Sequence, residues 1–262
     1  MLGEHVLGLD EPVWTVALLR ALDALGVVRN TARQAIARSA ADGWLEREQH
    51  GRSARWRLTA PTRHQLEDGA RRIYSFAPVT SGWDGRWLLV RVSAPEEHRG
   101  RRHQARSRLA WAGFGSLGQG LWISPHVDRG AALLETLRAP WPGASPAVTT
   151  TFVVEGGSVD DEQALVDEAW GDRRDLQAEY ERFIAEVTAA GGDGRPLTGE
   201  AAFVAQTRMV HAWRKFPFLD PGLPRALLPG DWPGSQAAAL FADRHARWGD
   251  DAGSWFRAGN HA

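Results

Sequence analysis

The chain has 262 residues, a formal net charge of −1 and no cysteine. Its length favours two or three compact units, and the missing cysteines exclude disulfide bonds, thiolate zinc sites and cysteine nucleophiles. No segment approaches the roughly 18 consecutive apolar residues of a membrane span, and "MLGEHVLGLD" lacks the pattern of a secretory signal. We therefore expect a cytoplasmic protein with no membrane partner.

Positive charge is concentrated in one part of the chain. Between Gly26 and Arg72 there are ten arginines and five acidic residues, whereas the segments before and after each carry a net charge of −3. A local excess of this kind predicts that a polyanion docks on this part of the molecule, while the overall balance argues against a general nucleic-acid coat.

Two short helices are expected around the start of this basic segment. In "TVALLRALDALG" the apolar residues have helical spacing, and Gly26 suits the end of the helix. They are Val16, Leu18, Leu19, Leu22 and Leu25. The second helix is expected to start near Asn30 or Thr31, because Thr31 and Gln34 have the capping-box spacing. The side chains on its inner side are mostly small, and those on its outer side are mostly hydrogen-bond donors. The inner residues are Ala32, Ala35, Ile36 and Ser39, and the outer ones are Arg33, Gln34, Ala37 and Arg38.

A basic hairpin is expected next, with Gly51 in the turn between "GWLERE" and "ARWRL". Leu45, Trp56 and Leu58 would face inward, and Arg47, Arg55 and Arg57 outward. Helix, turn, helix and basic hairpin is the winged helix-turn-helix order, in which the second helix enters the major groove of DNA and the hairpin, or wing, follows the backbone. The predicted DNA-binding residues are Asn30, Thr31, Arg33, Gln34 and Arg38 on the helix, and Arg52, Ser53 and Arg55 on the wing. The alternative is a solvated arginine-rich helix beside an ordinary hairpin.

The middle of the chain predicts a mixed α/β unit after a connecting helix that follows Pro61. The expected order is strand "RWLLVRVS", helix "EEHRGRRHQARSRLAWAG", two short strands in "FGSLGQGLWIS", helix "DRGAALLETLR" and strand "AVTTTFVV". This is the ferredoxin-like split βαβ order. Neither a nucleophile elbow nor a glycine-rich phosphate loop is visible, so the sequence does not support an enzyme.

The last hundred residues predict helices that end in a loose tail, "GDDAGSWFRAGNHA". "RMVHAWRKF" is the candidate ligand site in this part, on a helix that should end near Phe216 because Pro217 follows. Arg208, Arg214 and Lys215 are candidate phosphate partners, Trp213 and Phe216 candidate apolar walls, and His211 a candidate hydrogen-bond donor. The alternative is that the helix dipole alone favours these cations. We predict an α+β chain with domains at residues 1–80, 81–157 and 158–262.

Three stretches together resemble the PaaX-like transcriptional regulators, the phenylacetic-acid-degradation repressor family. The stretches are "TARQAIARSAADGWLERE" with the basic hairpin, "WDGRWLLVRVSAPEEHR" with "WAGFGSLGQGLWISP", and "VHAWRKFPFLDPGLPRALLPGDWPG". The resemblance implies a cytoplasmic, usually dimeric repressor with a winged-helix domain, a Cas2-like middle domain and a helical C-terminal domain. It also implies an operator DNA partner and release by an aryl-CoA thioester such as phenylacetyl-CoA, with no cofactor and no metal.

The sequence departs from this pattern in two places. The segment before "EPVWTVALLR" is short, so the helix that supports the DNA-reading pair must come from "LGEHVLGL". Nuclease members of the Cas2-like fold have an aspartate at the end of the first strand, where this chain has Ser93, so metal-dependent cleavage loses a ligand. A DNA-binding regulator without any small-molecule effector is a further alternative.

Overall fold

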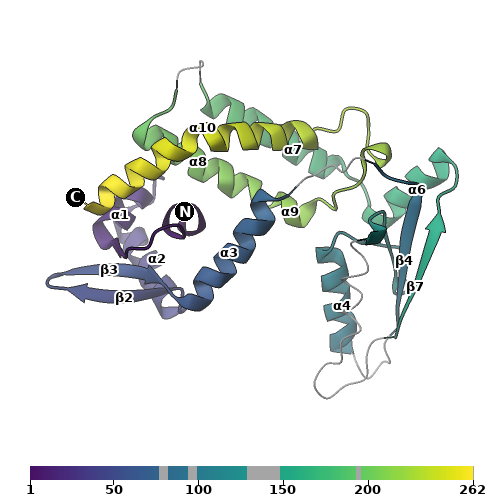
Figure 1. Cartoon of the computed structure of the whole chain (residues 1–262), viewed down its shortest axis with the longest axis horizontal. Coiled ribbons are helices and arrows are strands. Elements are labelled where there is room, and N and C mark those ends of the chain that lie inside the picture. The colour runs from purple at the N-terminus through teal and green to yellow at the C-terminus, as the bar shows by residue number, and fades with distance from the viewer. Residues whose placement is uncertain (77–81, 94–98, 129–147, 193–195, 262) are drawn as a thin grey trace. The chain divides into compact units, whose positions relative to one another are not determined.

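The computed structural model describes residues 1–76, 82–128, 148–192 and 196–261, except for 94–98 (Figure 1). The chain forms two compact units. Unit 1 consists of Met1–Phe76, Arg182–Lys215 and Gln236–Ala262, and unit 2 of Ala77–Glu181 and Phe216–Ser235. The division into three domains stays a prediction. Within the described ranges, no helix is both long and apolar enough to cross a membrane.

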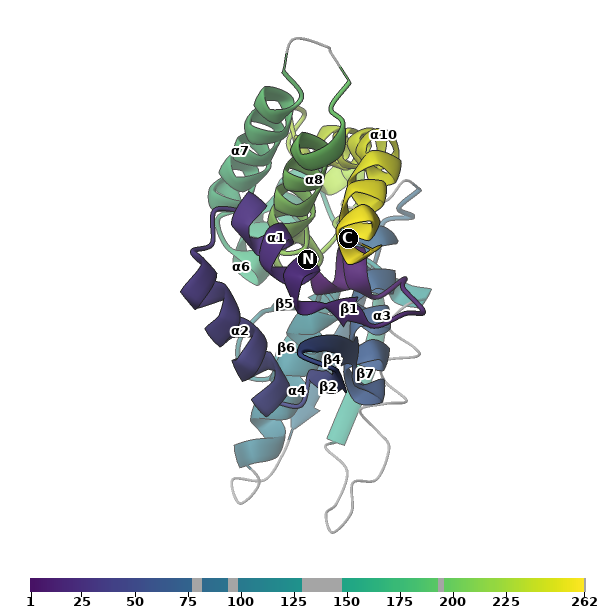
Figure 2. The same cartoon turned by 90° about the vertical axis from the view of Figure 1, so that its left-hand side faces the viewer.

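The N-terminal part of unit 1 has the predicted order of two helices and a hairpin. Its elements are a π-helical turn η1 (Leu2–Val6), β1 (Val13–Trp14), α1 (Thr15–Ala24), α2 (Arg29–Ala41), β2 (Leu45–His50), β3 (Ser53–Leu58) and α3 (Ala60–Tyr74). The strands form an antiparallel sheet in the order β1-β3-β2. Figure 2 shows α2 below α1 and beside the strands of this sheet. The "LGEHVLGL" segment supplies only the short turn η1, not a full helix.

The two helices pack through small residues, and two details of the prediction are wrong. Helix α2 buries Ala32 and Ile36 as predicted, but the buried face of α1 consists of Ala17, Leu18 and Ala21. Val16 is 58% exposed, because it lies on the opposite side of α1 from Leu18. The expected capping box is also absent: α2 already begins at Arg29, and no side chain caps it.

The remainder of unit 1 is helical. It contains the second half of α7 (Arg174–Ala190), α8 (Gly199–Trp213) and nearly all of α10 (Gly234–His261). The expected loose tail is wrong, because α10 continues through it. Ala252 and Phe256 provide the reason: both are buried, and Phe256 stacks on Phe203 of α8 at 6.1 Å between ring centroids.

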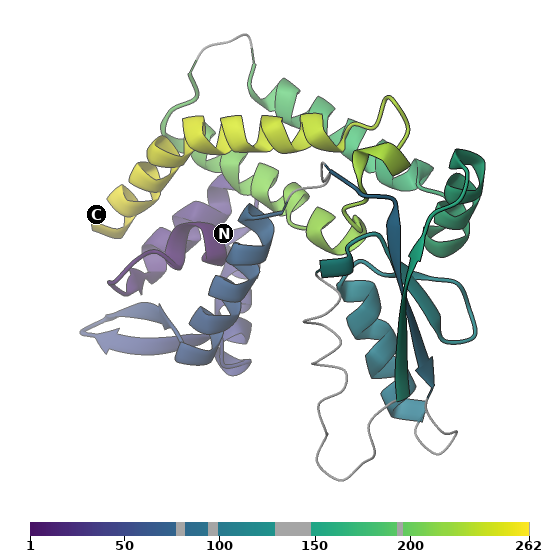
Figure 3. The same ribbon diagram turned by 45° about the vertical axis from the view of Figure 1, so that its right-hand side comes forward.

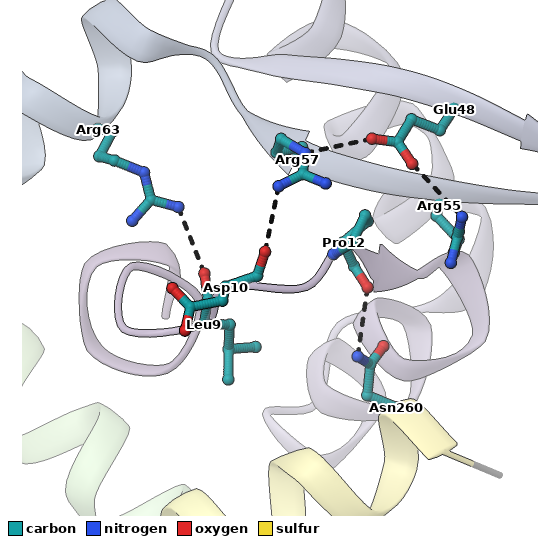
Figure 4. Close-up of polar contacts among 8 residues, drawn as sticks. All are labelled: Leu9, Asp10, Pro12, Glu48, Arg55, Arg57, Arg63 and Asn260. Carbon is teal, nitrogen blue, oxygen red and sulfur yellow. Dashed lines mark hydrogen bonds and ion pairs between the residues drawn. The ribbon is translucent and has the colours of Figure 1, made fainter.

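The end of α10 is joined to β1 by one side chain. Asn260 is 5% exposed, its Oδ1 accepts a hydrogen bond from the Trp14 backbone N–H (2.7 Å), and its Nδ2 donates to the Pro12 carbonyl (3.3 Å; the latter in Figure 4). Buried backbone groups need such partners. The C-terminal helix therefore provides hydrogen-bond partners for two backbone groups at the start of the N-terminal sheet.

Unit 2 contains a four-stranded antiparallel sheet in the order β5-β6-β4-β7 (Figure 3). Its elements are β4 (Arg86–Ser93), α4 (Arg99–Trp111), β5 (Gly115–Ser116), β6 (Leu121–Ser124), β7 (Val148–Glu155), α6 (Val159–Trp170), the first half of α7, α9 (Phe216–Leu219) and a 3₁₀ turn (Arg225–Leu227). This strand order agrees with the predicted split βαβ unit. The helix expected in "DRGAALLETLR" lies almost entirely in residues 129–147, outside the described residues.

Each face of this sheet carries an apolar core. Val90 and Val92 of β4 pack with Leu109 of α4 in one of them. The core on the other face contains Trp87 of β4 and Ile123 of β6. Val166 and Ala169 of α6 and Leu223 and Leu227 of the segment after α9 pack against them. The segment "FLDPGLPRALLPG" therefore has a structural role, because its residues Leu223 and Leu227 complete the core on this face of the sheet.

A buried tyrosine–aspartate pair fixes the start of that loop. Asp220 is 8% exposed, the Tyr180 hydroxyl donates to its Oδ2 (2.6 Å), and the Gly222 N–H donates to its Oδ1 (2.7 Å). Burial raises the pKa of Asp220 to about 6, although both hydrogen bonds favour the charged form. Tyr180 also stacks on Phe216, with ring centroids 4.1 Å apart.

A buried carboxylate connects four elements of unit 1. The Glu4 side chain, on η1, is 7% exposed and accepts hydrogen bonds from Tyr74 of α3, from Gln206 Nε2 of α8 (2.6 Å) and from His245 Nε2 of α10 (3.0 Å). Burial disfavours the charged form, but the three donors outweigh it and lower the pKa of Glu4 to about 2. The neighbouring His5 bonds Thr207 Oγ1 through Nε2 (2.8 Å), and burial lowers its pKa to about 4.

We expect Glu4→Gln to lower the free energy of unfolding by about 1–3 kcal/mol at pH 7, because the amide has a single acceptor oxygen and leaves a buried donor unpaired. The folded-state pKa of Glu4 lies below its usual value of 4.5, so the carboxylate stabilises the fold fully above pH 4.5 and loses this effect as the pH falls toward 2. Urea denaturation should show the difference between wild type and variant narrowing below pH 4.5. Glu200→Gln, at an exposed glutamate of α8, is the control and should change nothing. A difference that is constant with pH would contradict this role of Glu4.

Candidate nucleic-acid interface

The outer side of α2 presents polar side chains to solvent. The five residues predicted for this helix, Asn30, Thr31, Arg33, Gln34 and Arg38, are all exposed. Within the described ranges, none of their side chains has a hydrogen bond or ion pair with another part of the chain. Burial of Ala32 and Ile36 against α1 fixes the rotation of the helix, and this rotation turns the donors outward.

One exposed cation of α2 was missed by the sequence analysis. Arg29 is the first residue of the helix and is exposed. The expected capping box placed the helix start one or two residues later, so Arg29 was assigned to the preceding turn. Gly26, with φ +85°, forms that turn, and the Val27 N–H bonds back to the Leu22 carbonyl (2.9 Å).

The hairpin buries the predicted inward residues, but Arg47, expected to face outward with Arg55 and Arg57, is paired with Trp56 and lies on the face of the buried residues, where it is exposed. Leu45, Trp56 and Leu58 are buried, and the register pairs His50 with Ser53, which leaves Gly51 and Arg52 as the two-residue turn. Gly51 has φ +60° at the first turn position, where type II′ turns favour glycine. Arg52 and Ser53 are exposed at this tip.

Arg55 and Arg57 differ from Arg52 because Glu48 holds both of them (Figure 4). Glu48 lies opposite Arg55 in the register; its Oε2 is 3.6 Å from Arg55 Nη2, and its Oε1 is 3.2 Å from Arg57 Nε. Arg57 also donates to the Asp10 carbonyl (3.1 Å), and the Arg55 guanidinium lies 5.1 Å from the Trp14 ring centroid. A phosphate at Arg55 would therefore compete with a carboxylate.

The arginines of the basic segment thus divide into two groups. Several are held by the chain itself: Arg55 and Arg57 by Glu48, Arg63 by the Leu7 and Leu9 carbonyls, and Arg71 by Asp68. Arg29, Arg33, Arg38 and Arg52 are exposed and, in the part of the chain that is described, have no such partner. The unpaired positive charge lies on the outer side of α2 and at the hairpin tip.

The candidate ligand residues near the end of α8 are placed in different environments. Arg208, His211 and Arg214 are exposed, and Lys215 is half-buried. Burial lowers the pKa of His211, and the positive charges of Arg214, the Met1 amino group and Lys215 lower it further. The positive charges of Arg214, the Met1 amino group and Lys215 therefore lie around His211 in unit 1 and favour its neutral form.

The two candidate apolar walls lie in protein cores. Trp213 is 1% exposed, stacks on Phe241 at 4.7 Å and donates from Nε1 to the Ile73 carbonyl (3.2 Å). Phe216 is fully buried against Tyr180, and the boundary between the two units falls between Lys215 and Phe216. Their assignment as pocket walls stays a prediction.

Helix α4 carries a run of arginines in "RGRRHQARSRLAW". The side chains of residues 99–104 lie outside the described part, and Arg106 is exposed. No group of three or more histidine, aspartate or glutamate residues is placed to hold a metal ion among the residues that the structure describes.

The fold and this face define a mixed α+β protein with exposed arginines on the outer side of α2 and at the tip of the β2–β3 hairpin. The chain belongs to the PaaX-like family: residues 1–62 match "PaaX-like protein", residues 80–153 "PaaX protein central Cas2-like domain" and residues 170–258 "PaaX-like protein C-terminal domain". It is similar to "Transcriptional repressor PaaX" of Escherichia coli (strain K12), with 28% identity over 243 residues that cover 90% of this chain and 74% of the relative. Its fold is similar to that of "Uncharacterized protein Rv0674 from Mycobacterium tuberculosis", with a TM-score of 0.60, 21% identity and coverage of 98% and 96% of the two chains.

Proposed function

We propose that this protein is a DNA-binding transcriptional repressor of the PaaX type, in which α1, α2 and the β2–β3 hairpin act as a winged helix-turn-helix. The observation that carries the proposal is the set of unpaired donors on the outer side of α2. Similarity to the Escherichia coli repressor supports the same function.

Helix α2 is the element that we assign to the major groove. An α-helix fits this groove, and arginine and glutamine form paired hydrogen bonds with guanine and adenine edges there. Arg33, Gln34 and Arg38 are assigned to bases. Arg52 and Ser53 at the hairpin tip are assigned to phosphates, which position the protein without selecting sequence. Arg55 joins them if a phosphate displaces Glu48.

The helix and the hairpin tip should respond differently to substitution. Arg33→Ala or Gln34→Ala should cost on the order of 1–3 kcal/mol of binding free energy and relax sequence preference, because base contacts are lost. Arg52→Ala should weaken binding to all DNA alike and lower the salt slope by about one unit. Competition gel shifts at several salt concentrations measure both effects.

Two further variants make this experiment sharper. Glu48→Gln should strengthen binding to all DNA, because it frees Arg55 and Arg57 and removes a negative charge from the hairpin. Arg71→Ala, at an exposed arginine that Asp68 already holds, is the control and should leave binding unchanged. Identical behaviour of the Arg33 and Arg52 variants would contradict the division of roles.

We further propose that an acyl-CoA, with phenylacetyl-CoA as the first choice, releases the protein from its operator, and that the regulated genes serve phenylacetate or related aromatic catabolism. A CoA thioester is anionic at one end; the exposed Arg208 and Arg214 and the half-buried Lys215 supply charge of the opposite sign, and His211 supplies a hydrogen-bond donor. Because Trp213 and Phe216 are already packed, an acyl group would have to use other walls or displace their neighbours. The competing proposal is a regulator without an effector.

The thioester should weaken operator binding by roughly 5- to 150-fold, the range of ordinary allosteric coupling. Only a ligand that binds the DNA-incompetent state more tightly has this effect. Arg214→Ala should abolish the response and leave ligand-free DNA binding intact, as measured by calorimetry with the thioester and by gel shift. Arg174→Ala, an exposed arginine of unit 2 held by Asp172, is the matched control. A normal response of the Arg214 variant would place the pocket elsewhere, with α4 as the next candidate.

A symmetric dimer is the third part of the proposal, with the middle and C-terminal parts of the chain as the interface. Strand β7 ends the sheet order β5-β6-β4-β7, and Phe152, Val153 and Val154 on it are 54%, 52% and 39% exposed. A long apolar strand at a sheet edge is a surface on which a second copy can add its own strand. A two-fold dimer also doubles the DNA contacts on a palindromic site.

Light scattering at micromolar concentration should give the mass of a dimer, and footprinting should show two half-sites an integral number of helical turns apart. Phe152→Asp combined with Val154→Asp should give a folded monomer. Val16→Asp, at an exposed valine of unit 1, should leave the dimer intact. A monomeric wild-type protein that protects one half-site would contradict the proposal.

A further inference from the structure

The residue that precedes α2 breaks a local rule of helix stability. Helices favour Ser, Thr, Asp or Asn at the N-cap, because the side-chain oxygen accepts a hydrogen bond from a backbone N–H of the first turn. Here the N-cap is Val28, which provides no such bond. Its side chain is also 71% exposed, more than any other large apolar side chain measured in the described residues.

Neither the fold of α2 nor its packing requires valine at this position. The Val28 carbonyl accepts the first hydrogen bond of the helix, from the Ala32 N–H (2.9 Å), and any residue could provide this backbone contact. A polar cap would stabilise the helix more, and the exposed isopropyl group adds little to the core. Positions that break a local rule without a gain in folding are expected at functional sites.

The position of Val28 indicates what its side chain contacts. It lies at the end of α2 that carries Asn30 and Thr31, directly before the face with Arg33 and Gln34. The N-terminal residues of a recognition helix contact base edges. The C5-methyl group of thymine is the apolar group that a base pair presents in the major groove, and apolar side chains pack on it.

We infer that Val28 packs against the C5-methyl group of one thymine in each half-site, so that this valine selects thymine at that position. The inference rests on the proposed function, since it requires α2 to lie in the major groove. It adds an apolar specificity residue at the N-terminal end of a helix whose outer side offers hydrogen-bond donors.

A second exposed valine of the same unit provides the matched control. Val16 of α1 is 58% exposed, but it shares its side of the helix with Arg20, one turn later. The Arg20 guanidinium lies 4.0 Å from the Trp255 ring centroid of α10. The side of α1 that carries Val16 is therefore directed toward α10, not toward the outer side of α2.

The experiment begins with selection of duplexes from a randomised DNA library by the wild-type protein. Each thymine of the selected sequence is then replaced by deoxyuridine, which removes only the methyl group. At one thymine per half-site, wild type should lose affinity by about fourfold, as expected for one buried methyl group. Val28→Ser should bind both duplexes equally, whereas Val16→Ser should discriminate as wild type does.

The same serine variant separates a specificity role from a structural one. Val28→Ser supplies the missing cap, so its melting temperature should rise by about 2–4 °C while discrimination is lost. Should the variant melt below wild type, Val28→Ala is judged by the same assay. If the Val28 variants still discriminate thymine from deoxyuridine at the position where wild type does, or if wild type discriminates at none, the inference is overturned and the proposed function stands. If wild type enriches no sequence at all, sequence-specific repression fails and the inference falls with it.

Discussion

The arrangement of unit 1 depends on one buried carboxylate. Glu4 lies on a turn of five residues that is too short to be stable alone, and it receives donors from three helices that are distant in the sequence. A charge removed from water is tolerated only when its hydrogen-bonding capacity is filled. Tyr74, Gln206 and His245 fill it, and the positions of α3, α8 and α10 relative to the N-terminus are thereby set. The packing of His5 between Phe203 and Phe256 surrounds this polar cluster with aromatic rings.

Charge pairing explains how a protein of nearly zero net charge keeps a strongly basic face. Acidic residues are not spread evenly over the basic segment; Glu48 serves two arginines of the hairpin and Asp68 one of α3. Helix α2 contains no acidic residue; alanine, serine and glutamine lie between its arginines. The field at the surface is therefore set less by the number of arginines than by which of them have an internal partner.

Local periodicity predicted the elements that bury one side of a helix or strand. The faces of α2, the inward residues of the hairpin and the strands around β4 all follow this rule, because each depends on residues close in the sequence. The predictions are wrong where contacts with segments distant in the sequence determine the structure. The last residues of the chain look polar and glycine-rich, yet α8 and β1 give Phe256 and Asn260 partners that keep them helical. Trp213 and Phe216 looked available for a ligand for the same reason: nothing near them in the sequence reveals Phe241 or Tyr180. The absent cap of α2 is a different case: the sequence has the Thr31–Gln34 spacing of a capping box, but the short turn after Gly26 lets the helix begin at Arg29, so Thr31 lies inside its first turn.

The contact between Asn260 and β1 has an evolutionary consequence. Exchange of the N-terminal segment between related chains would require that the segment carry its own supports. Here the Asn260 side chain, in the last turn of the final helix, bonds the Trp14 backbone N–H of β1 and the carbonyl of Pro12 just before that strand, and the Glu4 carboxylate obtains two of its three donors from α8 and α10. A transferred N-terminal segment would leave these groups buried and unpaired. The two ends of the chain are thus expected to change together, whereas the outer side of α2, which makes no such contacts within the described residues, is free of this constraint.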